Sequence, residues 1–302
     1  MGIKKYLKAG IVHFMAFPQT IRGEGPILET LEGIATDPFF DLVEVGWIKD
    51  PETRKRVREL LEVSELEVGY GAQPRLLMQG LDLNTTDEVK RKEAIAVLKE
   101  SVDHALEIGA KRLAFLSGKD PGPEQREKAK ELLVDSIQQV CDYASSLDRE
   151  LKIILEIFDR DVDKRCLIGP SREAREVAEM VGRRNFGLMH DLSHLPLLRE
   201  PPLQALSEVK DYLIHAHVGN CCLEKGSELY GDQHPRFGIR GGCVDVEEVV
   251  EYLRALKQVG YIGGEPAPLT IEVKPAKGES SELVIANAKR VLLRACERVG
   301  LA

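Results

Sequence analysis

Short apolar segments alternate with longer amphipathic segments along the whole chain. Each apolar segment is brief and is bounded by Gly, Pro or charged residues, which is typical of a buried β-strand. The predicted strands span residues 9–17, 41–48, 66–71, 111–118, 151–156, 186–191, 212–217 and 269–272. The amphipathic segments carry apolar residues at helical spacing. They predict helices at 27–34, 51–61, 84–109, 123–146, 171–181, 203–208, 246–256 and 281–299.

Eight strands that alternate with eight helices predict an α/β protein with a parallel sheet. The number of units favours a closed (β/α)₈ TIM-type barrel over an open sheet, as one domain covering residues 1–302. No glycine-rich dinucleotide or P-loop motif occurs. Ser171 is predicted to cap the helix that it begins, and residues 72–83 are predicted to form a long loop.

Composition narrows the choice of partners. The 302 residues carry a formal net charge of −8, which argues against nucleic acid or an anionic membrane as the partner. No targeting segment or spanning run is apparent, and the six cysteines show no C-x-x-C spacing. We therefore expect a cytoplasmic protein with reduced thiols; a homo-oligomer stays open.

Four consecutive predicted strands end in a residue that can bind a metal ion. These residues are Glu156, Asp191, His217 and Glu272. In a parallel barrel the carboxyl ends of all strands face one mouth, so the four side chains should converge there. Three carboxylates and one imidazole make a hard, oxygen-rich site. This set favours a divalent ion, Mn²⁺ first, with Mg²⁺, Co²⁺ or Zn²⁺ as alternatives.

Other polar residues are predicted to surround this mouth. His194 could bind substrate, cap a loop or ligate a second metal ion, and Asp232 and His234 form another ligand-type pair in a long loop. Arg236 could hold an anionic or hydroxylated group. Lys274 should face the mouth, where an ion pair is favoured over a Schiff base. Three residues in strands are predicted to be interior: His215 as a structural residue, and Glu44 and His13 at the pocket floor.

These residues and their spacing resemble the xylose-isomerase-like barrel superfamily, over essentially the whole chain. The superfamily contains sugar isomerases and epimerases and the apurinic-site endonucleases. Its most specific features here are Glu156, the Asp191-x-x-His194 pair, His217, the Asp232-x-His234 pair and Glu272.

The resemblance to the ketose epimerases implies one divalent metal ion held by Glu156, Asp191, His217 and Glu272. It also implies that the two glutamates are catalytic, because they move the proton through a metal-stabilised enediolate. His194, with His234, Arg236 and Lys274 nearby, would then bind substrate. The segment 159–161 departs from the epimerase pattern, which leaves the sugar open.

The resemblance to the endonucleases implies a second metal site at His194, Asp232 and His234. A further zinc site of that branch needs histidines near residues 71–74 and 113–117, and none is present there. The favoured hypothesis is therefore a metal-dependent sugar isomerase or epimerase. A two-metal hydrolase of a phosphate or other ester is the second, and a non-catalytic sugar-binding barrel is the third.

Overall fold

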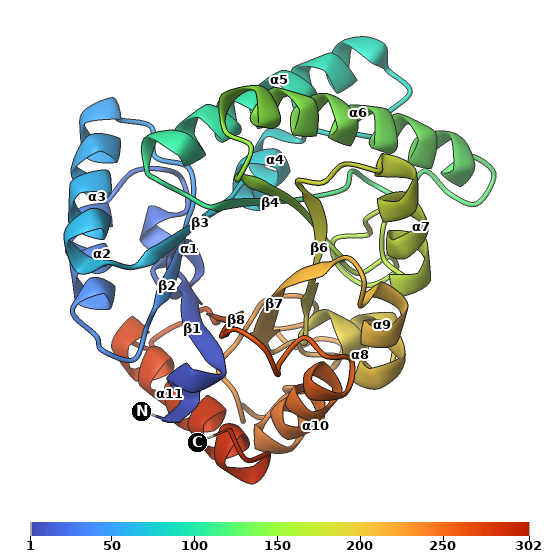
Figure 1. Ribbon diagram of the computed structural model, residues 1–302. Helices are drawn as coiled ribbons and strands as arrows, with labels where there is room; N and C mark the ends of the chain where they lie inside the picture. The colour runs from blue at the N-terminus through green and yellow to red at the C-terminus, as the bar shows by residue number, and fades with distance from the viewer. Residues whose placement is uncertain (1, 302) are drawn as a thin grey trace.

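The computed structural model describes residues 2–301, and its strands form a closed parallel barrel in the order of the sequence (Figure 1). The strands are β1 (Leu7–Val12), β2 (Leu42–Val45), β3 (Glu67–Gly71), β4 (Arg112–Leu116), β5 (Lys152–Glu156), β6 (Phe186–Asp191), β7 (Leu213–Gly219) and β8 (Ala267–Glu272). Strand β8 pairs with β1 and so closes the ring. The predicted (β/α)₈ barrel, built as a single domain, is confirmed.

Helices surround the barrel on the outside (Figure 1). The α-helices are α1 (His13–Ala16), α2 (Ile27–Ala35), α3 (Pro51–Ser64), α4 (Gln73–Gln79), α5 (Glu88–Glu107), α6 (Arg126–Leu147), α7 (Ser171–Val181), α8 (His194–Leu198), α9 (Pro202–Val209), α10 (Val246–Gln258) and α11 (Ser281–Arg298). Two short 3₁₀ helices are η1 (Gly2–Lys5) and η2 (Pro18–Thr20). None of the helices within residues 2–301 has the length and apolar character that a membrane crossing needs.

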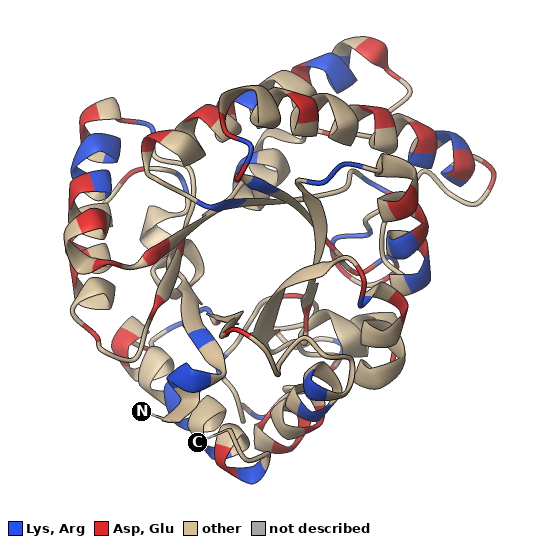
Figure 2. Cartoon of the chain, viewed as in Figure 1, with Lys and Arg blue, Asp and Glu red and all other residues tan. Residues whose placement is uncertain are grey.

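Two apolar layers hold the barrel together. The larger core lies between the outer faces of the strands and the helices, and a small separate cluster of Ala114, Ile154 and Met189 packs with Ile214. Charged residues gather on the outer helices, while the strands are mostly uncharged (Figure 2). Side chains alternate between the two faces of a strand, so Ile154 and Met189 share the inner face with the residues two positions later. Those residues are Glu156 and Asp191.

Several predicted elements differ from the structure at the mouth of the barrel. The first strand ends at Val12, and His13 begins α1 instead of continuing the strand. The predicted loop at 72–83 contains α4, and α8 follows β6 without having been predicted. Ser171 is not the cap of α7, because Pro170 holds that position and the Ser171 hydroxyl donates to Glu200 at 2.6 Å. The two-residue periodicity of strands does not reveal helices as short as α1, α4 and α8.

Candidate functional site

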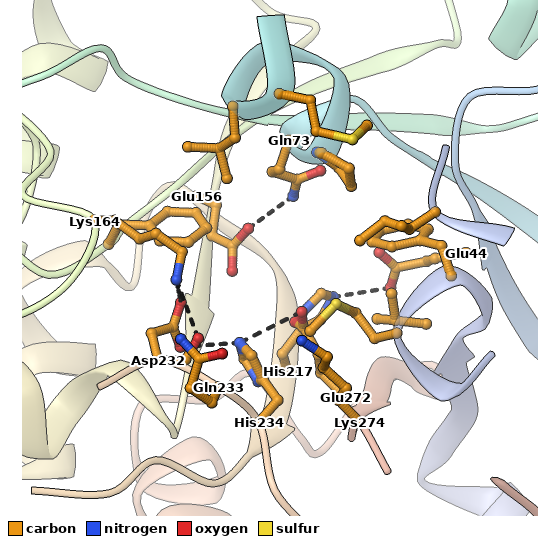
Figure 3. A pocket seen from close by; sticks show the side chains of 18 residues that line it. Glu44, Gln73, Glu156, Lys164, His217, Asp232, Gln233, His234, Glu272 and Lys274 are labelled. Carbon is orange, nitrogen blue, oxygen red and sulfur yellow. Dashed lines mark hydrogen bonds and ion pairs between the residues drawn. The ribbon is translucent and has the colours of Figure 1, made fainter. Parts of the chain in front are cut away.

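The ends of β5, β6, β7 and β8 bring Glu156, Asp191, His217 and Glu272 together. One ligand-type atom of each lies within 4.8 Å of the others, and all four side chains are buried. The strand register accounts for this, since Asp191 pairs with His217 and Gly219 pairs with Glu272. Figure 3 shows Glu156, His217 and Glu272 directed toward one region of the pocket. The acidic cluster, as we call these four residues, therefore forms as their positions at the strand ends predict.

His217 is held by carboxylates at both ring nitrogens. Its Nδ1 lies 2.8 Å from Glu272 Oε2 and 3.9 Å from Asp191 Oδ2, and its Nε2 lies 2.9 Å from Glu44 Oε1. Burial would lower the pKa of His217, but Glu44 and Glu272 raise it well above its usual value. The imidazole thus presents Nδ1 to the acidic cluster while Glu44 fixes its orientation.

Glu44 is anchored in turn by His215, whose Nε2 lies 2.7 Å from the same Oε1. Burial lowers the pKa of His215 to about 4, and Arg112 lowers it as well. A neutral His215 can donate from Nε2 to Glu44. Glu44 lines the pocket, as predicted, and His215 lies one layer deeper. His13 does not line it; its Nε2 contacts Thr30 Oγ1 at 2.8 Å instead.

His194, Asp232 and His234 form a second buried group beside the acidic cluster. Asp232 Oδ1 lies 3.2 Å from His194 Nε2 and 2.9 Å from His234 Nε2. Burial would lower both imidazole pKa values, but Asp232 and its neighbours raise that of His194 to about 10 and that of His234 to about 9. Asp191, His194 and His234 also offer ligand atoms within 4.8 Å of one another. Asp191 is thus shared by both groups.

The donor set fits a divalent cation. Within residues 2–301, four buried atoms of these two groups make no hydrogen bond of good geometry, although Asp232 Oδ1 lies at ion-pair distance from both histidines: Asp191 Oδ2, His194 Nε2, Asp232 Oδ1 and His234 Nδ1. Buried polar atoms are rarely left without a partner, so each such atom needs an explanation. A cation bound between the carboxylate oxygens would supply one and would offset their mutual repulsion.

The two glutamates of the acidic cluster differ in proton affinity. Burial raises the pKa of Glu156 to about 8, and the nearby Glu272 carboxylate adds to the rise. Burial would also raise the pKa of Glu272, but His234 and His217 lower it. In the metal-free protein the pKa of Glu156 therefore lies above that of Glu272. Such a pair can act as acid and base on one substrate.

A pocket of about 250 Å³ opens above the acidic cluster. Glu156, His217, Asp232, His234, Glu272 and Lys274 line it (Figure 3). His194 is fully buried beneath it, and its Nδ1 lies 2.7 Å from the Ile157 carbonyl oxygen. Arg236 is not among the lining residues, because its guanidinium donates to Glu279 at 2.7 Å. A role for Arg236 in substrate binding would require this ion pair to open.

Three polar residues of the pocket were not predicted from the sequence: Gln73, Lys164 and Gln233. Gln73, at the start of α4, donates from Nε2 to Glu156 Oε2 at 2.7 Å. Lys164 follows the segment 159–161 that departs from the epimerase pattern, and buried Asp159 accepts three backbone N–H groups at 2.8 Å and shapes the turn between them. Lys164 Nζ contacts Asp163 at 2.8 Å and Asp232 Oδ2 at 3.2 Å. Pro74 in the first turn was a signal for α4.

Comparisons with known proteins agree with this architecture. A structure of D-psicose 3-epimerase from Clostridium cellulolyticum H10 with D-tagatose is 16% identical, with a TM-score of 0.68 over 97% of this chain and 98% of that one. The IolI protein with a bound zinc atom is 17% identical, with a TM-score of 0.74 over 97% and 99%. D-allulose 3-epimerase from Methylomonas sp. in complex with D-allulose is 20% identical, with a TM-score of 0.67 over 98% and 97%.

At this level of identity these likenesses concern the fold alone. No curated protein matches the sequence. The family model for the xylose isomerase-like TIM barrel matches residues 38–292, which include the acidic cluster and the second group. The match covers most of the chain, and the closed eight-stranded barrel agrees with it. The protein therefore belongs to the xylose isomerase-like TIM barrel family.

Proposed function

We propose that the protein is a divalent-metal-dependent isomerase or epimerase of a small sugar or related hydroxy-carbonyl compound. The observation that carries this proposal is the buried acidic cluster under a pocket, in which two glutamates lie together with Asp191 and His217. The solved epimerase structures with the same fold, including those with D-tagatose and D-allulose, support the choice of a sugar-like substrate.

Glu156, Asp191, His217 and Glu272 would hold the ion, for which Mn²⁺ is our first choice. When bound, the cation supplies Lewis-acid polarisation of the substrate carbonyl and hydroxyl oxygens. Glu272 accepts the proton from the carbon beside the carbonyl, and Glu156 returns a proton from another side of the pocket. The two carboxyl groups approach the pocket from different sides in Figure 3, as an epimerisation requires. His194 holds Asp232, whose Oδ1 lies 3.2 Å from its Nε2.

The test is hydrogen exchange from solvent. With Mn²⁺ and D-fructose, D-tagatose or D-allulose in deuterated water, deuterium should enter the carbon beside the carbonyl. Glu272→Gln should slow this exchange by roughly 10²–10⁴-fold, because the base is lost while the shape is kept. Glu251→Gln, at an exposed position on α10, is the matched control. Full exchange by a folded Glu272→Gln protein would refute the assignment.

A second candidate is a two-metal hydrolase of a phosphate or other ester. The observation in its favour is the ligand group of Asp191, His194 and His234 beside the acidic cluster. Metal stoichiometry by mass spectrometry separates the two. One ion per chain that His234→Ala leaves in place supports the isomerase or epimerase. Two ions, one of them lost in His234→Ala, support the hydrolase, and no uptake of any metal favours a non-catalytic sugar-binding barrel.

A further inference from the structure

The pocket has two walls of different chemistry. Most polar residues come from the strand ends and from the loop after β7, with Gln73 added from α4 and Lys164 from the loop after β5. The apolar residues come from the end of β1, the segment after it, α4 and the segment just after β5. The apolar lining consists of Val12, Phe14, Met15, Ile21, Pro74, Leu77, Met78 and Phe158. A substrate with hydroxyl groups on every carbon would leave this wall without a matching partner.

Helix α4 joins the two kinds of surface. Gln73 and Leu77 are four residues apart, so they lie on one face of the helix. Gln73 is 8% exposed and touches Glu156, while Leu77 is 40% and the adjacent Met78 46% exposed. Along α4 the pocket thus changes from polar and buried at the acidic cluster to apolar and open at the rim.

Gln73 is built to receive a hydroxyl group. Its Nε2 is committed to Glu156, and its Oε1 is buried without a hydrogen-bond partner within residues 2–301. An amide oxygen accepts hydrogen bonds and cannot donate them. The group that completes it is therefore a donor, such as a substrate hydroxyl next to the reacting carbon.

The rim beyond Gln73 has a different character. Single exposed apolar side chains are common on protein surfaces, but Leu77 and Met78 join six other apolar residues around one pocket. Lys274 lies across the pocket from Gln73 in Figure 3. Lys164 is already paired with Asp163 and Asp232. Beyond the rim, Arg22 and Lys49 line a separate hollow beside Met78, and Lys49 is paired with Glu24.

We propose that α4 selects a hydroxy-carbonyl substrate whose end remote from the acidic cluster is apolar, a deoxy or alkyl group instead of a hydroxymethyl one. Gln73 would bind the hydroxyl near the reacting carbon, and Leu77 and Met78 would cover the apolar end. This inference rests on the proposed function, because it names the substrate class of the same pocket.

The test uses binding, so it does not depend on turnover. Calorimetry on the Mn²⁺-loaded protein would compare 1-hydroxy-2-alkanones of increasing length, beginning with hydroxyacetone, and a ketose of the same chain length. Each added methylene that reaches the rim should raise affinity by about fourfold, the effect of burying one CH₂ group. In Leu77→Gln and Met78→Gln this gain should fall, while hydroxyacetone binds as in the wild type. Met180→Gln, 49% exposed on α7, is the matched control and should keep the full gain.

Three results would overturn the inference. Affinity could fail to rise with tail length, the ketose could bind more tightly than the alkanone of equal length, or no probe could bind. An unchanged gain in both α4 variants would overturn the role of Leu77 and Met78. Affinity could rise with tail length in the wild type and rise less in the α4 variants while no deuterium enters any substrate. In that case the binding inference stands and the proposed chemistry falls.

Discussion

At the residue scale, the orientation of His217 depends on a carboxylate outside the acidic cluster. Glu44 contacts His217 Nε2 at 2.9 Å and leaves Nδ1 directed toward Glu272 and Asp191. Burial would raise the pKa of Glu44, but His217 and His215 lower it well below its usual value, so it stays ionised. A charged partner behind a metal-binding imidazole fixes the ring and strengthens it as a ligand.

Glu44→Gln should weaken Mn²⁺ binding by roughly 10–100-fold, because the amide has the shape of the carboxylate without its charge. Calorimetric titration of the metal-free protein measures this loss. Glu59→Gln, at an exposed position on α3, controls for a simple change in net charge. Equal affinity in Glu44→Gln and wild type would show that Nε2 needs no charged partner, and that His217 is oriented by the barrel alone.

At the scale of single elements, the short helix α1 depends on a neutral histidine. His13 is 1% exposed, and its Nε2 lies 2.8 Å from Thr30 Oγ1. The Thr30 hydroxyl donates to the Pro26 carbonyl at 2.7 Å and so accepts a hydrogen from His13. Burial lowers the pKa of His13 to about 3. Burial at the contact between α1 and α2 therefore favours the neutral imidazole.

The pH dependence of stability follows from this. The unfolded chain binds a proton on His13 near pH 6.5, and the folded protein does so only near pH 3. The contribution of neutral His13 to the free energy of unfolding is complete above pH 6.5. It is lost as pH falls, at up to about 1.4 kcal/mol per pH unit. Denaturant titrations of wild type and His13→Gln between pH 4.5 and 7.5 should show a shallower loss in the variant. Parallel curves would contradict the buried, neutral assignment.

The elements also show what the sequence could reveal. The acidic cluster was predictable because each member ends an apolar segment, and a parallel barrel brings such ends together. Helix α4 was not, because seven residues are too few for a helical period to stand out from a loop. Gln73 was missed because its role depends on a contact with Glu156, a residue 83 positions away. The pairing of Lys164 with Asp232 likewise depends on two loops that only the fold brings into contact.

At the scale of the whole molecule, the acidic cluster opposes stability in the metal-free protein. Burial and the neighbouring Glu272 raise the pKa of Glu156 to about 8, while the unfolded chain releases this proton near pH 4.5. A carboxyl with a raised folded pKa stabilises the fold fully only below its unfolded pKa, and that stability is lost as pH rises toward 8. Metal-free protein should therefore become less stable between pH 5 and pH 8 through this group.

Glu156→Gln removes the titrating group and keeps its size, so the metal-free variant should melt at a higher temperature than wild type at pH 8 and differ little at pH 5. Added Mn²⁺ should reverse the order at pH 8. A ligand at 100 times its dissociation constant stabilises a protein by about 2.7 kcal/mol, which is roughly 4 °C for a chain of this length. Wild type should gain this shift and Glu156→Gln should not, because it lacks one of the proposed ligands.

Melting curves at both pH values, with and without Mn²⁺, give all four comparisons. A variant that gains as much from Mn²⁺ as wild type would exclude Glu156 from the metal site, and a variant less stable than wild type without metal would show that the buried carboxyl is not a source of instability.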